Sequence, residues 1–190
     1  MKIVGVGCGP GMLTEEARRG LQKARLVYGS ERAIEIARSA IPEGCDVRVI
    51  EDYRRLKELP AHAIVLSTGD PMLAGLGYLP GEVVPGVSSL QVACARLKVP
   101  LTKIVCVSAH AKDHAGAREE AVDEVRRGKV VFLIADPELN VQDLAAALPT
   151  ETKIAVCEDL GYPNERIAVG TAAEPPEARG DLFVVLVGEF

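Results

Sequence analysis

The chain has 190 residues, a net charge of −5, no tryptophan, three phenylalanines and four tyrosines. This balance argues against non-specific nucleic-acid binding, which needs lysines and arginines to displace counterions, and against stacking of bases on aromatic side chains as the main binding mechanism. No apolar run approaches the roughly 18 residues of a membrane span, and the N-terminus shows no secretory leader pattern, so we expect no membrane association.

The cysteines are odd in number, and no two of them form a Cys-x-x-Cys pair. A disulfide framework and a zinc site of the usual spacing are therefore not expected. Reduced thiols predict a cytoplasmic location. The five are Cys8, Cys45, Cys94, Cys106 and Cys157.

Strands and helices alternate along the first half of the chain. Its β-branched and aliphatic runs are typical of strands that are buried on both faces of a parallel sheet. Thr14 and Ser30 stand where a helix N-cap is expected, and apolar residues follow each of them at helical spacing. The predicted strands are 2–6, 25–28, 46–50 and 63–67, and the predicted helices are 13–24, 30–41 and a helix from residue 88 or 89 to 97.

The break Lys98-Val99-Pro100 is the candidate domain boundary, which gives domains 1–99 and 100–190. The end of the chain has strands with few helices between them, which favours a mixed, partly antiparallel sheet. The second domain is predicted to contain strands 103–107, 129–135, 153–157, 165–169 and 182–187, and helices 115–127 and 141–148. The fold class is thus α/β in two domains, with a mostly parallel N-terminal sheet and a mixed C-terminal sheet.

The stretch VGVGCGPGMLT, residues 4–14, has a glycine-rich turn between a strand and a helix. The dinucleotide pattern G-x-G-x-x-G fails, because Pro10 or Met12 stands where the third glycine belongs. The first acidic residue after the second strand is Glu31, inside the next helix, and no Gly-Lys-Ser/Thr occurs. The loop therefore suits a close backbone approach rather than a diphosphate, and a tight turn without a ligand stays open. A nicotinamide dehydrogenase is the weakest alternative.

Two further loops follow predicted strands, where ligands bind in parallel α/β sheets. In Gly69-Asp70-Pro71 the carboxylate is directed by the turn; a plain β-turn with an Asx hydrogen bond is the alternative. In Pro85–Ser89, Ser88 or Ser89 can cap the next helix, and its hydroxyl can also meet a polar ligand.

In this order, the three loops resemble those of the tetrapyrrole methylases, which depend on S-adenosylmethionine (SAM). Within that family the resemblance is greatest to the branch of precorrin-6Y methylases, or cobalt-precorrin-7 C-5 methyltransferases, of cobalamin biosynthesis. There are two departures: Ala111 replaces a glycine, and 75–85 is short, so that a helix of many relatives is expected to be trimmed or lost. The segments that carry the likeness are 5–14, 29–33, 69–71, 85–100, 108–110 and 158–167.

The resemblance implies that SAM binds in a cleft between the two domains of a homodimer and leaves as S-adenosylhomocysteine. No catalytic residue is assigned, because an enamine-like C-5 carbon needs no strong base and alignment supplies much of the rate. The expected SAM-binding residues are Pro10, Gly69, Asp70, Leu73, Ser88, Ser89 and, by its position after a central strand, Ala135. The candidates for the substrate carboxylates are Arg96, His110, Lys112 and Arg166, for which a solvated surface role is the alternative.

His110 and His114 could share a metal on one helix face, but no third ligand has a suitable spacing, so no metal is expected. A separate protein is expected to carry the C-15 methylase and decarboxylase activity that some relatives have fused. Two alternative functions stay open: another branch of the family, of siroheme or diphthamide type, and a regulatory module that binds SAM without transferring its methyl group.

Overall fold

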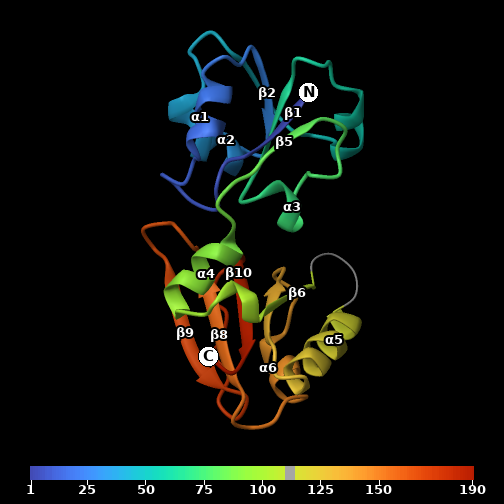
Figure 1. Cartoon of the computed structure of the whole chain (residues 1–190), viewed down its shortest axis with the longest axis vertical. Coiled ribbons are helices and arrows are strands. Elements are labelled where there is room, and N and C mark those ends of the chain that lie inside the picture. Colours follow the sequence, from blue (N-terminus) through green and yellow to red (C-terminus); the bar gives the residue numbers. More distant parts are fainter. Residues whose placement is uncertain (110–113) are drawn as a thin grey trace. The chain divides into compact units, whose positions relative to one another are not determined.

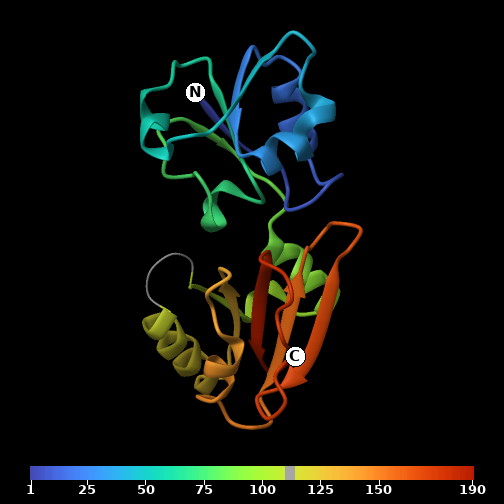
Figure 2. The same cartoon turned by 180° about the vertical axis from the view of Figure 1, so that it is seen from behind.

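The computed structural model describes residues 1–109 and 114–190, which form two compact units, Met1–Ser89 and Leu90–Phe190 (Figure 1). The predicted boundary at residue 99 falls ten residues later than this division. The difference is the helix α4 (Ser89–Leu97), which lies over the second sheet in both views (Figures 1 and 2). Its residues Val92, Ala93 and Cys94 are buried. A proline break marks the end of this helix, but burial of its apolar side decides to which unit it belongs.

The first unit contains a five-stranded sheet in the order β3-β2-β4-β1-β5. All neighbouring strands are parallel; Lys2 pairs with Ile64, for example, and Lys2 also pairs with Glu82. The carboxyl ends of the strands therefore meet at one edge, as the sequence predicts. The strands are β1 (Lys2–Gly5), β2 (Leu26–Gly29), β3 (Asp46–Val49), β4 (Ile64–Ser67) and β5 (Glu82–Val84), the last of which was not predicted.

Short helices connect these strands. The hydroxyl of Thr14 accepts a hydrogen bond from Ala17 N–H at 3.1 Å, and that of Ser30 accepts one from Ala33 N–H at 3.2 Å, which confirms both predicted caps. None of residues 75–81 is helical, in agreement with the expected loss of a helix there. The helices are α1 (Glu15–Leu21), α2 (Glu31–Ala37), α3 (Pro71–Ala74) and the 3₁₀ turns η1 (Arg38–Ala40) and η2 (Tyr53–Glu58).

The second unit contains a mixed sheet in the order β6-β7-β10-β8-β9. Only the pair β6–β7 is parallel among these neighbours, and β7–β10, β10–β8 and β8–β9 are antiparallel, which confirms the predicted mixed sheet. The elements after α4 are η3 (Leu101–Lys103), β6 (Ile104–Ser108), α5 (His114–Arg126), β7 (Val130–Ile134), α6 (Val141–Ala145), β8 (Lys153–Glu158), β9 (Arg166–Thr171) and β10 (Phe183–Gly188).

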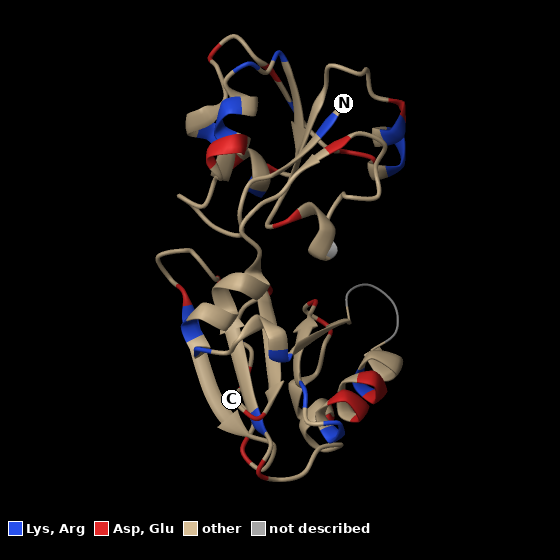
Figure 3. Ribbon diagram, in the orientation of Figure 1, with Lys and Arg blue, Asp and Glu red and all other residues tan. Residues whose placement is uncertain are grey.

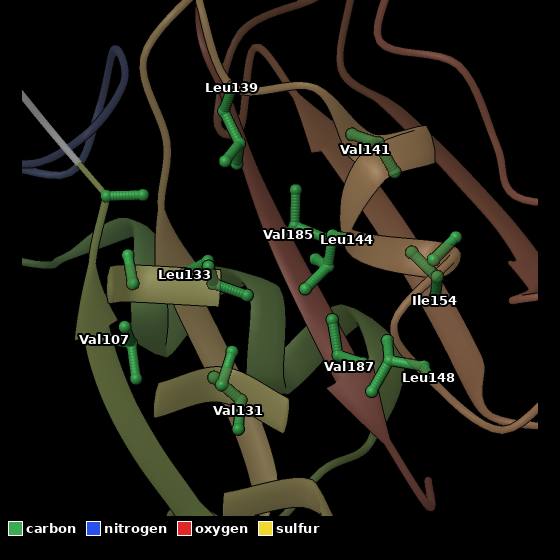
Figure 4. Packing of buried hydrophobic residues seen from close by; sticks show 14 of the residues in the cluster. Val107, Val131, Leu133, Leu139, Val141, Leu144, Leu148, Ile154, Val185 and Val187 are labelled. Carbon is green, nitrogen blue, oxygen red and sulfur yellow. The ribbon is translucent and has the colours of Figure 1, made fainter. Parts of the chain in front are cut away.

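Each sheet is buried on both faces at its centre. In the first unit Ile3 and Val4 of β1 are both fully buried, which explains why the strand reads as an uninterrupted apolar run. In the second unit Leu133 and Val185 pack with Leu144 of α6 (Figure 4). Among the described helices, none combines the length and apolar character that crossing a membrane requires.

Candidate functional site

Three loops leave the carboxyl edge of the parallel sheet and are joined by main-chain hydrogen bonds. We call them the glycine loop (residues 6–14, after β1), the aspartate loop (68–70, after β4) and the serine loop (85–88, after β5). Gly69 N–H donates to Gly7 O at 2.8 Å, and Gly7 N–H donates to Gly69 O at 3.3 Å. Cys8 N–H donates to Val87 O at 3.0 Å. The loops that the sequence singled out therefore form one cluster, although the bonded residues Cys8 and Val87 are 79 positions apart.

The carboxylate of Asp70 connects the aspartate loop to α3 and to the serine loop. One oxygen accepts a hydrogen bond from Met72 N–H at 2.8 Å and caps α3, and the other accepts one from Gly86 N–H at 2.9 Å. The Asx hydrogen bond considered as the alternative is thus present. The carboxylate keeps further hydrogen-bonding capacity, because each of its oxygens can accept a second hydrogen bond.

Glycines allow the three loops to approach this closely. A Cβ on Gly86 would lie 2.1 Å from Gly69 O, and a Cβ on Gly5 would lie 2.6 Å from Gly86 N. Gly69 has a φ of +71°, and a Cβ there would meet only the Cα of Ser88, at 3.8 Å. A side chain at Gly69 would therefore project into open space beside Ser88, where a ligand can reach the bare backbone.

The structure brings some of the predicted SAM-binding residues together and places the others apart from them. Gly69, Asp70 and the buried Ser88 lie together in the loop cluster, while Pro10 is exposed on the turn of the glycine loop. Leu73 is half-buried on α3, Ser89 is the first residue of α4, and Ala135 follows β7 in the second unit. The roles of these residues in binding SAM stay predictions.

Met72 is a residue of this region that sequence reasoning missed. Its side chain is 68% exposed on α3, directly after the Asp-Pro turn. An apolar residue in a four-residue helix carries no periodic signal, so only the structure reveals its exposure.

Of the predicted substrate ligands, Arg96 and Arg166 have carboxylate partners. Arg96 Nε donates to Glu165 Oε1 at 2.6 Å, and Arg166 is hydrogen-bonded to Glu158. A substrate carboxylate would therefore compete with these pairs, and the assignment stays a prediction. His110 and Lys112 lie outside the described residues.

Glu158 connects the end of β8 to β9 and to the segment before β10, while Glu165 holds the turn between β8 and β9. Burial alone would raise the pKa of Glu158, but N–H groups of Arg179 (2.5 Å) and Gly180 (2.8 Å), together with Arg166, outweigh it and hold the pKa below its ordinary value. The Arg96 guanidinium likewise lowers the pKa of Glu165, which also accepts from Gly161 N–H at 2.8 Å. The family-like segment 158–167 thus has a structural role in this chain.

A second polar pair lies where the parallel strands β6 and β7 end. His114 Nε2 is 3.1 and 3.2 Å from the two carboxylate oxygens of Asp136, which follows β7 by two residues. The position of Asp136 after a predicted strand was an available signal for this pair. Across the described parts of the chain, no three His, Cys, Asp or Glu side chains gather as a metal site requires.

Comparisons with known proteins agree on one family. The family model described as Tetrapyrrole (Corrin/Porphyrin) Methylases matches residues 2–176. The chain is 30% identical to a probable cobalt-precorrin-7 C(5)-methyltransferase of Methanocaldococcus jannaschii, over 96% of this chain and 94% of that protein. It is 29% identical to a precorrin-6Y C(5,15)-methyltransferase [decarboxylating] of Mycobacterium tuberculosis, and spans about half (51%) of that protein's length. Among solved structures, precorrin-6Y methylase from Archaeoglobus fulgidus has a TM-score of 0.79 at 28% identity, covering 100% of this chain and 98% of that chain.

Proposed function

Because the chain belongs to the tetrapyrrole methylase family, whose enzymes transfer methyl groups from SAM, we propose that it methylates the C-5 meso carbon of a precorrin-7 or cobalt-precorrin-7 intermediate in cobalamin biosynthesis. The observation that carries the proposal is the hydrogen-bonded cluster of the glycine, aspartate and serine loops. Full-length similarity to a C(5)-methyltransferase supports this branch of the family over the others.

The loop cluster fits a ligand that packs against bare backbone. Gly69 leaves open space beside Ser88, and Asp70 holds the aspartate and serine loops at a fixed separation. When bound, SAM supplies an electrophilic methyl group on a sulfonium. In the transfer, the C-5 carbon would form a bond to the methyl group, the methyl–sulfur bond would break with sulfur keeping the electron pair, and the positive charge passed to the ring would be removed by loss of the C-5 proton to solvent. The residues of the chain act by alignment and by excluding water, since charge on the sulfonium is neutralised as the bond breaks.

The test is a two-step assay on the purified full chain. S-adenosylhomocysteine is titrated first by calorimetry, with NAD in parallel; saturable binding of the former alone is expected. Enzymatically prepared metal-free and cobalt-bound ring substrates are then incubated with ¹³C-methyl SAM, and carbon NMR of the product is expected to place the label at C-5. Methylation of a uroporphyrinogen or of a diphthamide-type protein instead would replace the proposal by the corresponding branch. Binding without any transfer would leave a SAM-binding module.

Three finer points belong to the same proposal. A homodimer, a cytoplasmic location, and a separate C-15 methylating and decarboxylating protein in the pathway stay predictions. The free state of all five cysteines is compatible with a reducing compartment. Sedimentation of the purified chain at micromolar concentration is the direct measurement of its oligomeric state.

A further inference from the structure

A cavity lies in the first unit, beside α1 and mainly at the amino ends of β1 and β4. It has a volume of about 390 Å³. Lys2 and Ile64 are the first residues of these strands, whereas Gly5 and Ser67 are the last and lead into the loops. At about 3.3 Å per residue, the length of β1 and β4 puts about 10 Å between Lys2 or Ile64 and the loops. On β5 the lining reaches further, to Val84, which directly precedes the serine loop. None of the lining residues belongs to the glycine, aspartate or serine loop, so the cavity is distinct from the loop cluster.

Basic side chains from two different elements surround this cavity. Arg19 and Lys23 belong to α1 and the turn that follows it, while Lys2 and His62 belong to β1 and to the turn before β4. Glu16 is the one carboxylate in the lining. Within the lining, the cations Lys2, Arg19 and Lys23 thus outnumber the single carboxylate, although the chain as a whole has a net charge of −5. The ribbon of α1 has both basic and acidic residues in Figure 3, and the basic residues of the lining come from α1 and the turn after it as well as from β1 and the turn before β4.

The existing ion pairs leave part of this charge available. Lys2 Nζ is 2.9 Å from Glu82, and Arg19 Nε is 3.9 Å from Glu15, with both partners of the second pair 69% exposed. Exposed pairs of this kind contribute little and exchange readily. Within the described chain, Lys23 and His62 make no ion pair or hydrogen bond with a side chain. An anion that enters the cavity can therefore gain contacts without leaving a buried carboxylate unpaired.

The floor of the cavity is apolar, and its wall contains a glycine that the helix does not need. Ala24, Ala63, Ile64 and Val84 are each less than 9% exposed and form the floor. Gly20 is within α1, where glycine costs about 1 kcal/mol relative to alanine. A Cβ on Gly20 would meet nothing within 4 Å, so no steric contact requires glycine at this position. Because Gly20 has no side chain, this part of the cavity wall stays open.

We propose that this cavity is a second ligand site, which binds a small organic anion with at least two phosphate or carboxylate groups. The opposed pairs Arg19/Lys23 and Lys2/His62 each receive one anionic group, and the apolar floor receives the carbon skeleton. The volume lies within the range of small-molecule pockets, about 300–1,000 Å³. This site is independent of the proposed methyl transfer.

Calorimetric titration of the full chain with pyrophosphate and, separately, with citrate tests the proposal at physiological salt. Saturable binding of either probe is expected; pyrophosphate alone would indicate a phosphorylated ligand, and citrate alone a polycarboxylate. The double variant Arg19→Glu/Lys23→Glu should bind at least about tenfold more weakly, because two charge-assisted contacts are lost. The matched control Arg32→Glu reverses an exposed charge on α2 and should bind as the wild type does.

The variant Gly20→Leu distinguishes binding inside the cavity from non-specific electrostatic attraction of the anion to the protein surface. It leaves every charge in place, improves helix propensity and fills the open space, so it should lose binding while its stability is kept. Binding of S-adenosylhomocysteine is the readout for an intact loop cluster and should be unchanged in all of these variants. Wild-type affinity for the probe in Gly20→Leu, or no saturable binding of either probe to the wild type, would overturn the proposal.

Discussion

The carboxylate of Asp70 accepts a hydrogen bond from Gly86 N–H at 2.9 Å and so connects two loops whose residues are 16 positions apart. The same carboxylate caps α3 through Met72 N–H. One side chain therefore fixes both the exit from β4 and the approach of the serine loop. If SAM binds this cluster, much of the effect of Asp70 on its affinity arises from loop geometry.

We expect Asp70→Ala to remain folded but to lose about 2–4 kcal/mol of unfolding free energy, since a helix cap and a charge-assisted hydrogen bond disappear together. Affinity for S-adenosylhomocysteine should fall about tenfold or more. Urea unfolding and calorimetry measure the two effects. The matched control is Asp52→Ala, which removes a cap from η2 (Arg54 N–H, 2.9 Å) without an inter-loop contact. It should cost about 1 kcal/mol and leave the affinity unchanged. Equal loss of affinity in both variants would contradict the role of Asp70.

Gly86→Ala should be more damaging than its single added methyl group suggests. The new Cβ would lie 2.1 Å from Gly69 O and 2.9 Å from the carbonyl carbon of Gly5, and both of these are backbone atoms that cannot rotate away. We expect a loss of about 3 kcal/mol, at the upper end of the cost of overpacking, and weaker S-adenosylhomocysteine binding. Gly44→Ala is the control, because a Cβ there meets nothing within 4 Å; its stability should stay within about 0.5 kcal/mol of the wild type. Near-neutral behaviour of Gly86→Ala would show that the loops can separate freely.

The loops could be predicted from the sequence because their chemistry is local. Glycine and proline favour a turn at the position where they occur. Thr14 and Ser30 cap helices through hydrogen bonds to N–H groups three residues later, so the start of each helix can be predicted from the local sequence. The parallel sheet followed from apolar runs such as that around Ile3, which must be buried on both faces.

What the sequence did not reveal depends on contacts between distant residues. Arg96 meets Glu165 across 69 positions, so its pairing competes with the substrate role expected from its charge. Strand β5 has three residues and owes its position to pairing with β1 rather than to its own pattern. Helix α4 was assigned to the first unit by the proline that follows it, whereas Cys94 on its buried side belongs to the second unit.

Acid should weaken the second unit through Glu158. Its folded pKa lies below the ordinary value of 4.5, so its contribution to stability is present above that value and is lost as the pH falls through the lower folded pKa. Glu158→Gln should therefore be less stable than the wild type by about 2 kcal/mol at pH 7, and the difference in stability should shrink as the pH falls below 4.5 and through the lower folded pKa, where the wild type also loses the charge. Urea unfolding at pH 7, 5 and 3.5 measures this. The exposed Glu174→Gln should show no such convergence, and a gap that is constant with pH would refute the role of the Glu158 charge.

The thiols should differ in reactivity, and Cys157 should be the most protected of those with a resolved shift. Burial, together with the nearby Glu165 and Cys94, raises the pKa of the Cys157 thiol to about 12, so only about one molecule in ten thousand carries the thiolate at pH 8. Burial also raises the pKa of Cys106, but its side chain is exposed on β6, and Cys45 is partly exposed. With iodoacetamide at pH 8, mass spectrometry of peptides should find Cys45 and Cys106 modified while Cys157 stays intact. In urea all five should react at similar rates, and the variant Cys45→Ser assigns the fastest phase. Rapid modification of Cys157 in the native protein would mean that the strand β8 opens far more often than its burial predicts.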